Sequence, residues 1–274
     1  MASVEFFGLE RIDEQRWRMP VVRSLISGTG ALFGGAGLGA GIEAAEAATG
    51  RSVTWATAQY LNYAPEGSIL DLEVDEIVRG NQVSQVRVIC TVEGREIITV
   101  IGAFGNRPVP LEGQWSVRPQ VPPPDECPPR PMMDHHEGTI SSRMEMKLAA
   151  ARSFVDLRGS PSDSGTSALW VRFPGLDQPS ASGLAIIGDF VPFGIGQALG
   201  ARAGGNSLDN TLRVARLVPT DWVLADVRIH AVQQGFGHGL VHLWSDDGTL
   251  LGTASQSTMV RAWREEPPTQ QELK

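Results

Sequence analysis

The segment from Gly183 to Arg213 limits the possible folds of this 274-residue chain more than any other. Its first half is apolar and spaced by glycines, and a helix of this sequence carries large apolar side chains on several sides: Ile186, Ile187, Phe190, Phe193 and Ile195. Such a helix is enclosed by protein instead of lying on a surface. Ala203-Gly204-Gly205 interrupts the pattern, and residues 206–217 then alternate as a strand does. The sequence therefore predicts a sheet wrapped around a buried helix.

The composition is that of a globular chain that is large enough to bury one large core or two ordinary ones. Hydrophobic residues make up 42% and charged residues 20%, and the net charge of −8 argues against non-specific binding to nucleic acid. The two cysteines, Cys90 and Cys127, are too few for a disulfide framework. Neither a signal peptide nor an uninterrupted apolar stretch of transmembrane length is found, so we expect a cytoplasmic protein without a membrane span.

An internal duplication organises the chain. Residues 29–49 form a Gly-rich start and an Ala-rich helix, which four strand-like runs follow at 53–63, 69–79, 83–92 and 97–104. The apolar segment of the second half is likewise followed by four runs, at 207–217, 223–233, 237–244 and 250–260. The turn at Glu93-Gly94 recurs at Asp247-Gly248, an offset of 154 residues between the two glycines. A helix followed by a four-stranded meander therefore occurs twice.

A proline-rich segment, VPPPDECPPRPMM, separates the two halves and cannot continue a sheet ladder. We therefore predict an α+β protein with an N-terminal domain at residues 1–106, a Pro-rich linker at 107–137 and a C-terminal domain at 138–274. Each domain is expected to wrap an antiparallel sheet around its own helix. Opening strands are predicted at residues 4–19 and 140–150, and a short strand at 168–173.

Three polar residues of the second half could form a site. Asp209, His230 and Gln256 fall on the first, second and fourth strands of its meander, and the equivalent first-half positions hold Trp55, Glu76 and Gly102. Neighbouring strands lie about 4.8 Å apart, so side chains on one face can converge. A carboxylate in apolar surroundings and a glutamine amide could hold and deprotonate a water molecule. The alternatives are a turn cap for Asp209, a core or edge histidine for His230, and ordinary strand polarity for Gln256.

Motifs for metals and cofactors are not apparent in the sequence. The pairs His135-His136 and His238/His242 lack a third ligand at an obvious spacing. The chain has no GxSxG, GxGxxG or Walker-type motif. We therefore expect neither a metal nor a cofactor.

Four stretches resemble the acyl-CoA thioesterase II family, whose members have a double hotdog fold. They are FGG at 33–35, SLD at 207–209, DW at 221–222 and DGTLLGTASQSTMVR at 247–261. The resemblance covers nearly the whole chain outside the linker and is most specific in SLD and in the glutamine of the last strand. It implies two antiparallel sheets, each around a central helix, and hydrolysis of an acyl-CoA to a free acid and CoA.

The resemblance also implies roles for individual residues. In that family the Asp after SL, a Ser or Thr on the next strand and the Gln of the last strand position the hydrolytic water. Asp209 and Gln256 match this pattern, whereas the third position falls on His230. The histidine that usually follows SLD is Asn210, and the glutamine that usually follows FGG is Ala36.

Substrate contacts are expected where the central helices begin. Amides at Gly34 and Gly35 would polarise the thioester oxygen, because helix N-termini present free N–H groups. Ile187, Phe190 and Val191 would line the acyl pocket, with core packing as the alternative role. One working site per chain is expected.

The sequence is also compatible with two rival functions. One is a non-catalytic acyl-CoA-binding module, and the other is a hotdog enoyl-CoA hydratase. The hydratase pattern places a histidine five residues after the aspartate, where this chain has Val214. The expected partner is the acyl-CoA substrate, and a homo-oligomer is compatible with the resemblance because hotdog sheets often pair through their edges.

Overall fold

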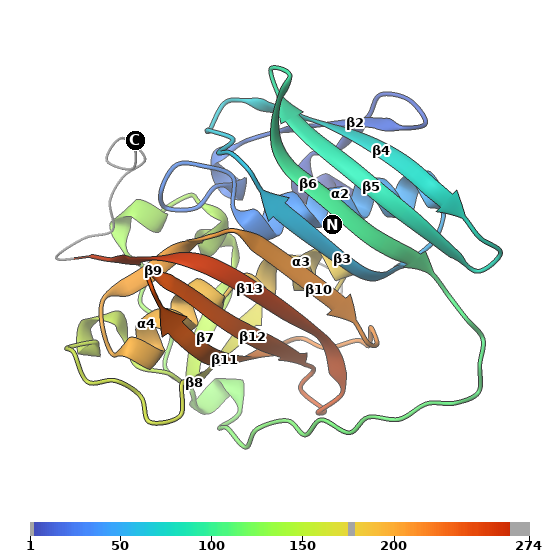
Figure 1. The fold of residues 1–274 in the computed structure, drawn as a ribbon. Helices are drawn as coiled ribbons and strands as arrows, with labels where there is room; N and C mark the ends of the chain where they lie inside the picture. Colours follow the sequence, from blue (N-terminus) through green and yellow to red (C-terminus); the bar gives the residue numbers. More distant parts are fainter. Residues whose placement is uncertain (1–2, 175–178, 264–274) are drawn as a thin grey trace.

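Strands of the two halves wrap two core helices in a computed structural model, which describes residues 3–174 and 179–263 (Figure 1). All the strand pairings are antiparallel, in the order β1-β2-β4-β5-β6-β3-β10-β13-β12-β11-β8-β7, and β9 also pairs with β13. This arrangement confirms the predicted α+β double hotdog. The outer bounds of the two predicted domains, residues 1 and 274, lie outside the described residues.

Helix α2 (Gly34–Thr49) is the core helix of the N-terminal half. Strands β3 (Val53–Tyr60), β4 (Ile69–Arg79), β5 (Val83–Val92) and β6 (Arg95–Gly105) follow it, close to the predicted ranges. The opening strand was predicted wrongly, because the chain begins with α1 (Ser3–Phe7) and the short strands β1 (Glu10–Arg11) and β2 (Arg16–Pro20). Phe6 and Phe7 are adjacent and both buried, whereas a strand would point them to opposite faces.

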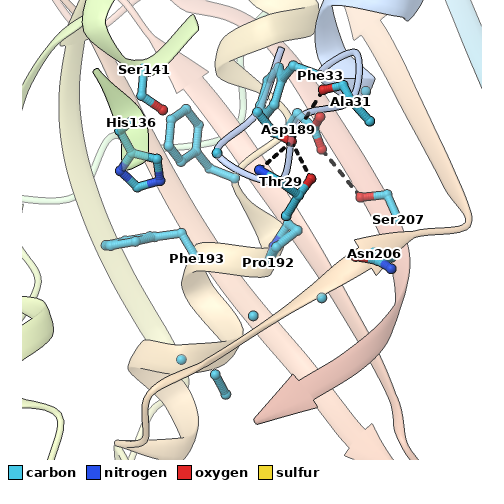
Figure 2. Close-up of a pocket in the computed structure, with 18 of the residues that line it drawn as sticks. Thr29, Ala31, Phe33, His136, Ser141, Asp189, Pro192, Phe193, Asn206 and Ser207 are labelled. Atoms are coloured by element: carbon cyan, nitrogen blue, oxygen red, sulfur yellow. Dashed lines mark hydrogen bonds between the residues drawn. The ribbon is translucent and has the colours of Figure 1, made fainter. Parts of the chain in front are cut away.

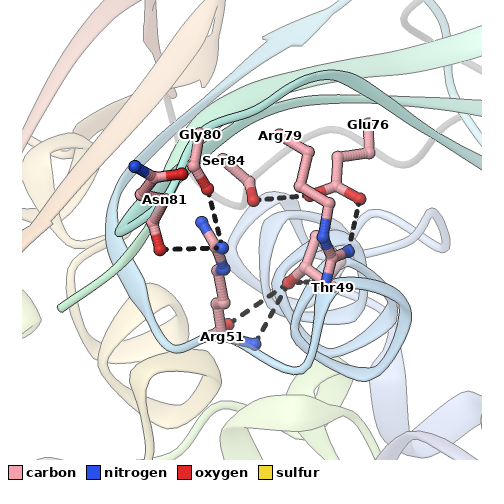
Figure 3. Close-up of polar contacts among 8 residues, drawn as sticks. Thr49, Arg51, Glu76, Arg79, Gly80, Asn81 and Ser84 are labelled. Atoms are coloured by element: carbon pink, nitrogen blue, oxygen red, sulfur yellow. Dashed lines mark hydrogen bonds and ion pairs between the residues drawn. The ribbon is translucent and has the colours of Figure 1, made fainter.

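The C-terminal end of α2 is fastened to the sheet by polar contacts (Figure 3). Gly50 ends the helix with φ +67°, and its N–H donates to the Glu46 carbonyl at 2.9 Å. The backbone N–H of Arg51 donates to the Thr49 hydroxyl at 3.2 Å, and its guanidinium donates to the Gly80 carbonyl at 2.8 Å. The position of α2 is therefore fixed relative to the β4–β5 turn.

The core helix of the C-terminal half is bent. Helix α3 (Ala181–Ile187) and helix α4 (Val191–Leu199) are separated by a turn, where the sequence predicted a continuous helix. Pro192 explains the break, because proline lacks an N–H and is accommodated only in the first turn of a helix. The segment Ala181–Leu199 is long and apolar enough to cross a membrane, but most of it is buried inside this fold.

The strands of the C-terminal half follow the predicted order. They are β7 (Glu145–Ala150), β8 (Thr166–Arg172), β9 (Ala203–Ser207), β10 (Asp209–Val214), β11 (Val223–Gln233), β12 (Phe236–Trp244) and β13 (Leu250–Ala262). The run predicted from residue 207 is divided between β9 and β10. The strand predicted at 140–150 starts later, because residues 140–143 form a 3₁₀ turn.

Strands β3 and β10 join the two halves into a continuous sheet. Thr57 lies opposite Thr211 in this pairing, and their hydroxyl oxygens are 2.6 Å apart. These two residues are separated by 154 positions, the offset of the duplication. Equivalent residues therefore meet at this seam, as they do on a two-fold axis.

Residues 106–144, all described, contain 3₁₀ turns at Pro124–Glu126, Asp134–His136 and Ile140–Arg143 but no strand or α-helix. This segment runs along the C-terminal half, where the Trp170 indole N–H donates to the Pro122 carbonyl at 2.9 Å. The predicted boundaries of the two domains and the linker stay predictions.

Helices α2 and α3 approach each other closely at glycines. A Cβ on Gly35 would lie 2.6 Å from the Ala185 carbonyl oxygen and 2.7 Å from Ile186 Cα. A Cβ on Gly39 would lie 3.0 Å from the Ser182 carbonyl oxygen. Since backbone atoms cannot yield as a flexible side chain can, this helix pair requires glycine at position 35.

We expect Gly35→Ala to lower the free energy of unfolding by about 1–3 kcal/mol, because the added methyl forces the two helices apart. Gly41→Ala in the same helix is the matched control, since its Cβ would meet only the Val100 side chain, at 3.0 Å. The gain in helix propensity of about 1 kcal/mol should offset that contact. Denaturant unfolding of both variants measures the difference, and equal losses would contradict the proposed role of Gly35.

Candidate functional site

Asp189 occupies the turn between α3 and α4 and lines a cavity of about 440 Å³ (Figure 2). The residue is only 6% exposed. Its neighbours in sequence are Ile186-Ile187-Gly188 before it and Phe190-Val191-Pro192 after it. The bend in the core helix therefore places a carboxylate inside the apolar interior.

Three groups donate hydrogen bonds to the Asp189 carboxylate. The backbone N–H of Gly35 donates to Oδ2 at 2.6 Å, the Gln256 amide donates to Oδ1, and the Ser207 hydroxyl lies 3.5 Å from Oδ1. Gly35 belongs to the first turn of α2, which favours a negative charge at this end. The carboxylate of the second half is thus held by the helix of the first half.

The orientation of Gln256 follows from its contacts. Its Oε1 accepts a hydrogen bond from the Val191 backbone N–H, at 3.1 Å, in the first turn of α4. Its Nε2 therefore points to Asp189 and to Ser207 Oγ, the latter at 3.0 Å. Asp189, Ser207 and Gln256 form one connected polar cluster, which we call the Asp-Ser-Gln cluster.

Burial raises the pKa of Asp189 to about 7, although the hydrogen bonds from Gln256, Gly35 and Ser207 partly oppose this effect. The neighbouring Tyr60 is also enclosed, and burial together with the Asp189 charge raises its pKa well above 10. The Tyr60 hydroxyl is therefore neutral and can donate a hydrogen bond. It lies next to Gly34, whose Cβ would come within 3.0 Å of it.

The cavity extends from Asp189 along α4 and β9. Figure 2 shows Asn206 and Ser207 on one side of Asp189, and His136, Ser141 and Phe193 on the other. Asn206 donates to the Tyr63 hydroxyl at 2.6 Å, and Tyr63 is 48% exposed. Much of the remaining wall is apolar, including Leu32, Phe33, Ile98, Met133, Met144, Leu148, Phe190, Pro192 and Phe193. The cluster therefore borders a cavity suited to an apolar chain.

The expected meeting of Asp209 with Gln256 is not found. Asp209 Oδ1 accepts a hydrogen bond from the Ser257 backbone N–H at 2.8 Å, while the Gln256 side chain bonds to Asp189, Ser207 and Val191. The register of β10 and β13 places Asn210, not Asp209, on the face that Gln256 shares. Asn210 and Gln256 are buried, and Asp209 is partly exposed. Neighbouring side chains of a strand point to opposite faces, so Asp209, one position before Asn210, points away from Gln256.

His230 was also placed wrongly, because it does not line the cavity among the described residues. It is exposed and lies where the β11–β12 register shifts between Ile229 and Ala231. Its counterpart Glu76 occupies a similar irregularity in β4 and accepts hydrogen bonds from the exposed Arg79 and the buried Ser84 (Figure 3). His230 lies beside the row of residues that contains Gln256, but β12 separates the two strands and the His230 side chain is exposed, so it does not join the Asp-Ser-Gln cluster.

The predicted substrate-binding residues divide into two groups. Gly34 and Phe190 line the cavity. Gly35 faces Asp189 through its backbone N–H. Ile187 and Val191 are buried in the core and do not appear in the described cavity wall. Whether any of them contacts a substrate stays a prediction.

Asp189 and Ser207 were missed as site residues by the sequence analysis. Asp189 is the only charged residue of the apolar run at residues 183–201, which is the signal that could have identified it. Ser207 stands in the SLD stretch, two residues before the chosen Asp209. Its direction could not be deduced before the break between β9 and β10 was known.

Comparison with known proteins places this chain in a family. Residues 124–260 match the model of the acyl-CoA thioesterase C-terminal domain. A proposed thioesterase from Novosphingobium aromaticivorans DSM 12444 is 33% identical, with a TM-score of 0.83, and 93% of this chain and 98% of that chain are covered. The chain belongs to the acyl-CoA thioesterase family.

Two more distant structures support the hotdog fold alone. A hotdog protein of unknown function from Alicyclobacillus acidocaldarius has 19% identity and a TM-score of 0.82, covering 96% of this chain and 99% of its own. An acyl-CoA thioesterase II from Mycobacterium marinum has 18% identity and a TM-score of 0.73, covering 98% of this chain and 100% of its own. No curated protein matches the sequence.

The raised pKa of Asp189 predicts a characteristic dependence of stability on pH. The unfolded chain ionises Asp189 near its ordinary pKa of about 4, whereas the folded chain retains the proton up to about 7. The folded state therefore binds more protons between these values, and the contribution of Asp189 to stability is lost as the pH rises. We expect the melting temperature of Asp189→Asn, relative to the wild type, to increase from pH 5 to pH 8.

Ser207→Ala is the control, because it keeps the titrating carboxyl group and should keep the wild-type trend. Thermal unfolding across this pH range measures all three proteins. A constant difference between wild type and Asp189→Asn would contradict the raised pKa.

Proposed function

We propose that this protein hydrolyses acyl-CoA thioesters with a water molecule that the Asp-Ser-Gln cluster holds. The observation that carries the proposal is that Asp189 and Ser207 meet on the wall of a largely apolar cavity, while Gln256 bonds to both of them. Membership of the acyl-CoA thioesterase family supports the reaction class. The sequence-based choice of Gln256 is kept, and Asp189 replaces Asp209 as the carboxylate.

In the proposed reaction the water oxygen attacks the thioester carbonyl carbon while the Asp189 carboxylate accepts a proton. The carbon–sulfur bond then breaks, the proton passes to the departing thiolate, and a carboxylic acid and CoA result. An aspartate with a pKa of about 7 is a stronger base than an ordinary one and is still substantially ionised at neutral pH. Ser207, which lines the cavity, would orient the water, and Gln256 would hold the carboxylate and the Ser207 hydroxyl in place.

The start of α2 supplies the complementary group for the thioester oxygen. The first N–H groups of a helix lack partners within it, and Gly34 both opens α2 and lines the cavity. The Gly34 N–H would stabilise the negative charge that develops on the carbonyl oxygen during attack. Without a side chain, Gly34 also leaves room between Asp189 and Tyr60, which its Cβ would approach to 2.9 and 3.0 Å.

Asp189→Asn should lower kcat/KM for acyl-CoA hydrolysis by about 10²–10⁴, the usual effect of removing a general base. Asp209→Asn is the matched control, because Asp209 faces the other side of the sheet and should leave kcat/KM within a few-fold. Release of CoA thiol from short, medium and long acyl-CoAs measures both variants. A loss of activity in Asp209→Asn but not in Asp189→Asn would assign the catalytic carboxylate to Asp209 and overturn the proposed role of Asp189.

The pH dependence offers an independent check of the same base. Because Asp189 must be ionised to accept a proton, kcat/KM should rise from acid pH and level off above about pH 7. Ser207→Ala should lower the value that kcat/KM reaches above pH 7, but kcat/KM should still rise between acid and neutral pH. A rate that is already constant at pH 5 would indicate that another group is the base.

Acyl-CoA is the substrate partner in this proposal, and no step requires a metal or cofactor. A cytoplasmic location and a possible homo-oligomer stay predictions from the sequence.

A further inference from the structure

Arg130 is a cation inside the cavity that borders Asp189. Its segment is fixed beside β7, since its backbone N–H donates to the Met146 carbonyl at 2.8 Å and the Leu148 N–H donates to the Pro128 carbonyl at 2.9 Å. The guanidinium lies 5.5 Å from the centre of the Phe193 ring, over its face. The backbone therefore holds this side chain against the cavity.

The charge of Arg130 has no counter-ion among the described residues. Its guanidinium contacts the Met146 sulfur at 3.6 Å and takes part in none of the ion pairs of the described chain. Burial lowers its pKa to about 10, so it stays charged at neutral pH. A guanidinium has five N–H donors, and a thioether is a weak acceptor for any of them. Arg130 is half-buried, and its remaining N–H donors face the cavity side where an anionic ligand could accept them.

The surrounding groups increase this positive character. Asp189 is the only carboxylate in the described cavity wall, and its oxygens are occupied by Gly35, Gln256 and Ser207. His136 lines the same wall, and burial together with His135 and Arg130 lowers its pKa to about 4. His136 is therefore neutral at pH 7, and its buried Nδ1 has no hydrogen-bond partner. The Arg130 side of the cavity thus offers a positive charge and a free polar nitrogen to a ligand.

Arg130 and Asp189 line the same cavity, so one acyl chain can have its thioester at Asp189 and its far end at Arg130. Phe193 follows Asp189 by four residues and lines this cavity as well, and its ring carries the Arg130 guanidinium over its face. Met133, Met144 and Phe193 lie along the same wall and suit methylene groups rather than a nucleotide.

We propose that Arg130 binds a carboxylate at the far end of the acyl group, so that CoA thioesters of dicarboxylic acids are the preferred substrates. This inference rests on the proposed thioesterase function and names its substrate class. The planar guanidinium matches a carboxylate in two parallel hydrogen bonds, which gives both affinity and selectivity over a methyl end.

The test compares adipyl-CoA with hexanoyl-CoA, which have equal chain lengths and differ only at the far end. The wild type should favour adipyl-CoA in kcat/KM by about 10-fold or more. Arg130→Met should lower kcat/KM for adipyl-CoA by about 100-fold and change that for hexanoyl-CoA by less than about 3-fold. Arg130→Lys, which keeps the charge but loses the planar fork, should fall between the two.

Equal losses on both substrates would overturn the proposal, because they would assign Arg130 to the CoA moiety that both share. A wild-type preference for hexanoyl-CoA would overturn it as well.

Binding of the two thioesters to the Asp189→Asn protein, with and without Arg130→Met, separates the inference about Arg130 from the proposed catalytic role of Asp189. Should the wild type hydrolyse no thioester, the catalytic proposal fails, yet tighter binding of adipyl-CoA that depends on Arg130 would still support the subsite. Equal dissociation constants for the two thioesters would refute it.

Discussion

The hydrogen bond from the Gly35 backbone to the Asp189 carboxylate is the contact on which the site depends. This hydrogen bond requires a close approach of α2 to α3. Glycine at position 35 permits it, because a Cβ there would lie 2.6 Å from the Ala185 carbonyl oxygen. A second buried link, the Ser182 hydroxyl donating to Glu43 at 2.5 Å, fixes the same pair of helices. The strands of the N-terminal half pack on α2, and those of the C-terminal half pack mainly on α4, which follows α3 after the turn at Asp189.

Enclosure has opposite effects on the two charged groups of the cavity. It makes the Asp189 carboxylate more basic, which favours proton acceptance, and it makes the Arg130 guanidinium less stable without an anion. Both features cost folding free energy in the empty protein. Sites that hold groups under such conditions commonly trade stability for function.

Much of the fold could be predicted from sequence, whereas the site could be predicted only in part. Strand alternation and paired turns identified the two meanders, and the offset of 154 residues identified the duplication. The bend at Pro192 and the break after Ser207 were not predicted, and these two irregularities place Asp189 and Ser207 in the cavity. Gln256 was chosen from its place in the meander and from the family resemblance; it bonds to Asp189 and Ser207, and its role in the reaction stays a prediction. Asp209 was chosen on motif position, and a single step of alternation moved it to the other face.

The seam at Thr57 and Thr211 has a consequence for how such a site can arise. Gly35 and Asp189 are also separated by 154 residues, so the two partners of the central hydrogen bond occupy equivalent places beside the same pseudo-two-fold axis. In a dimer of identical subunits these places would necessarily hold the same residue. If both places held aspartate, two like charges would face each other. If both held glycine, the site would have no carboxylate. Joining the halves in one polypeptide removes that restriction, since each copy can diverge. A pair of identical subunits therefore cannot have this asymmetry between the Gly35 donor and the Asp189 acceptor, whereas a duplicated chain can.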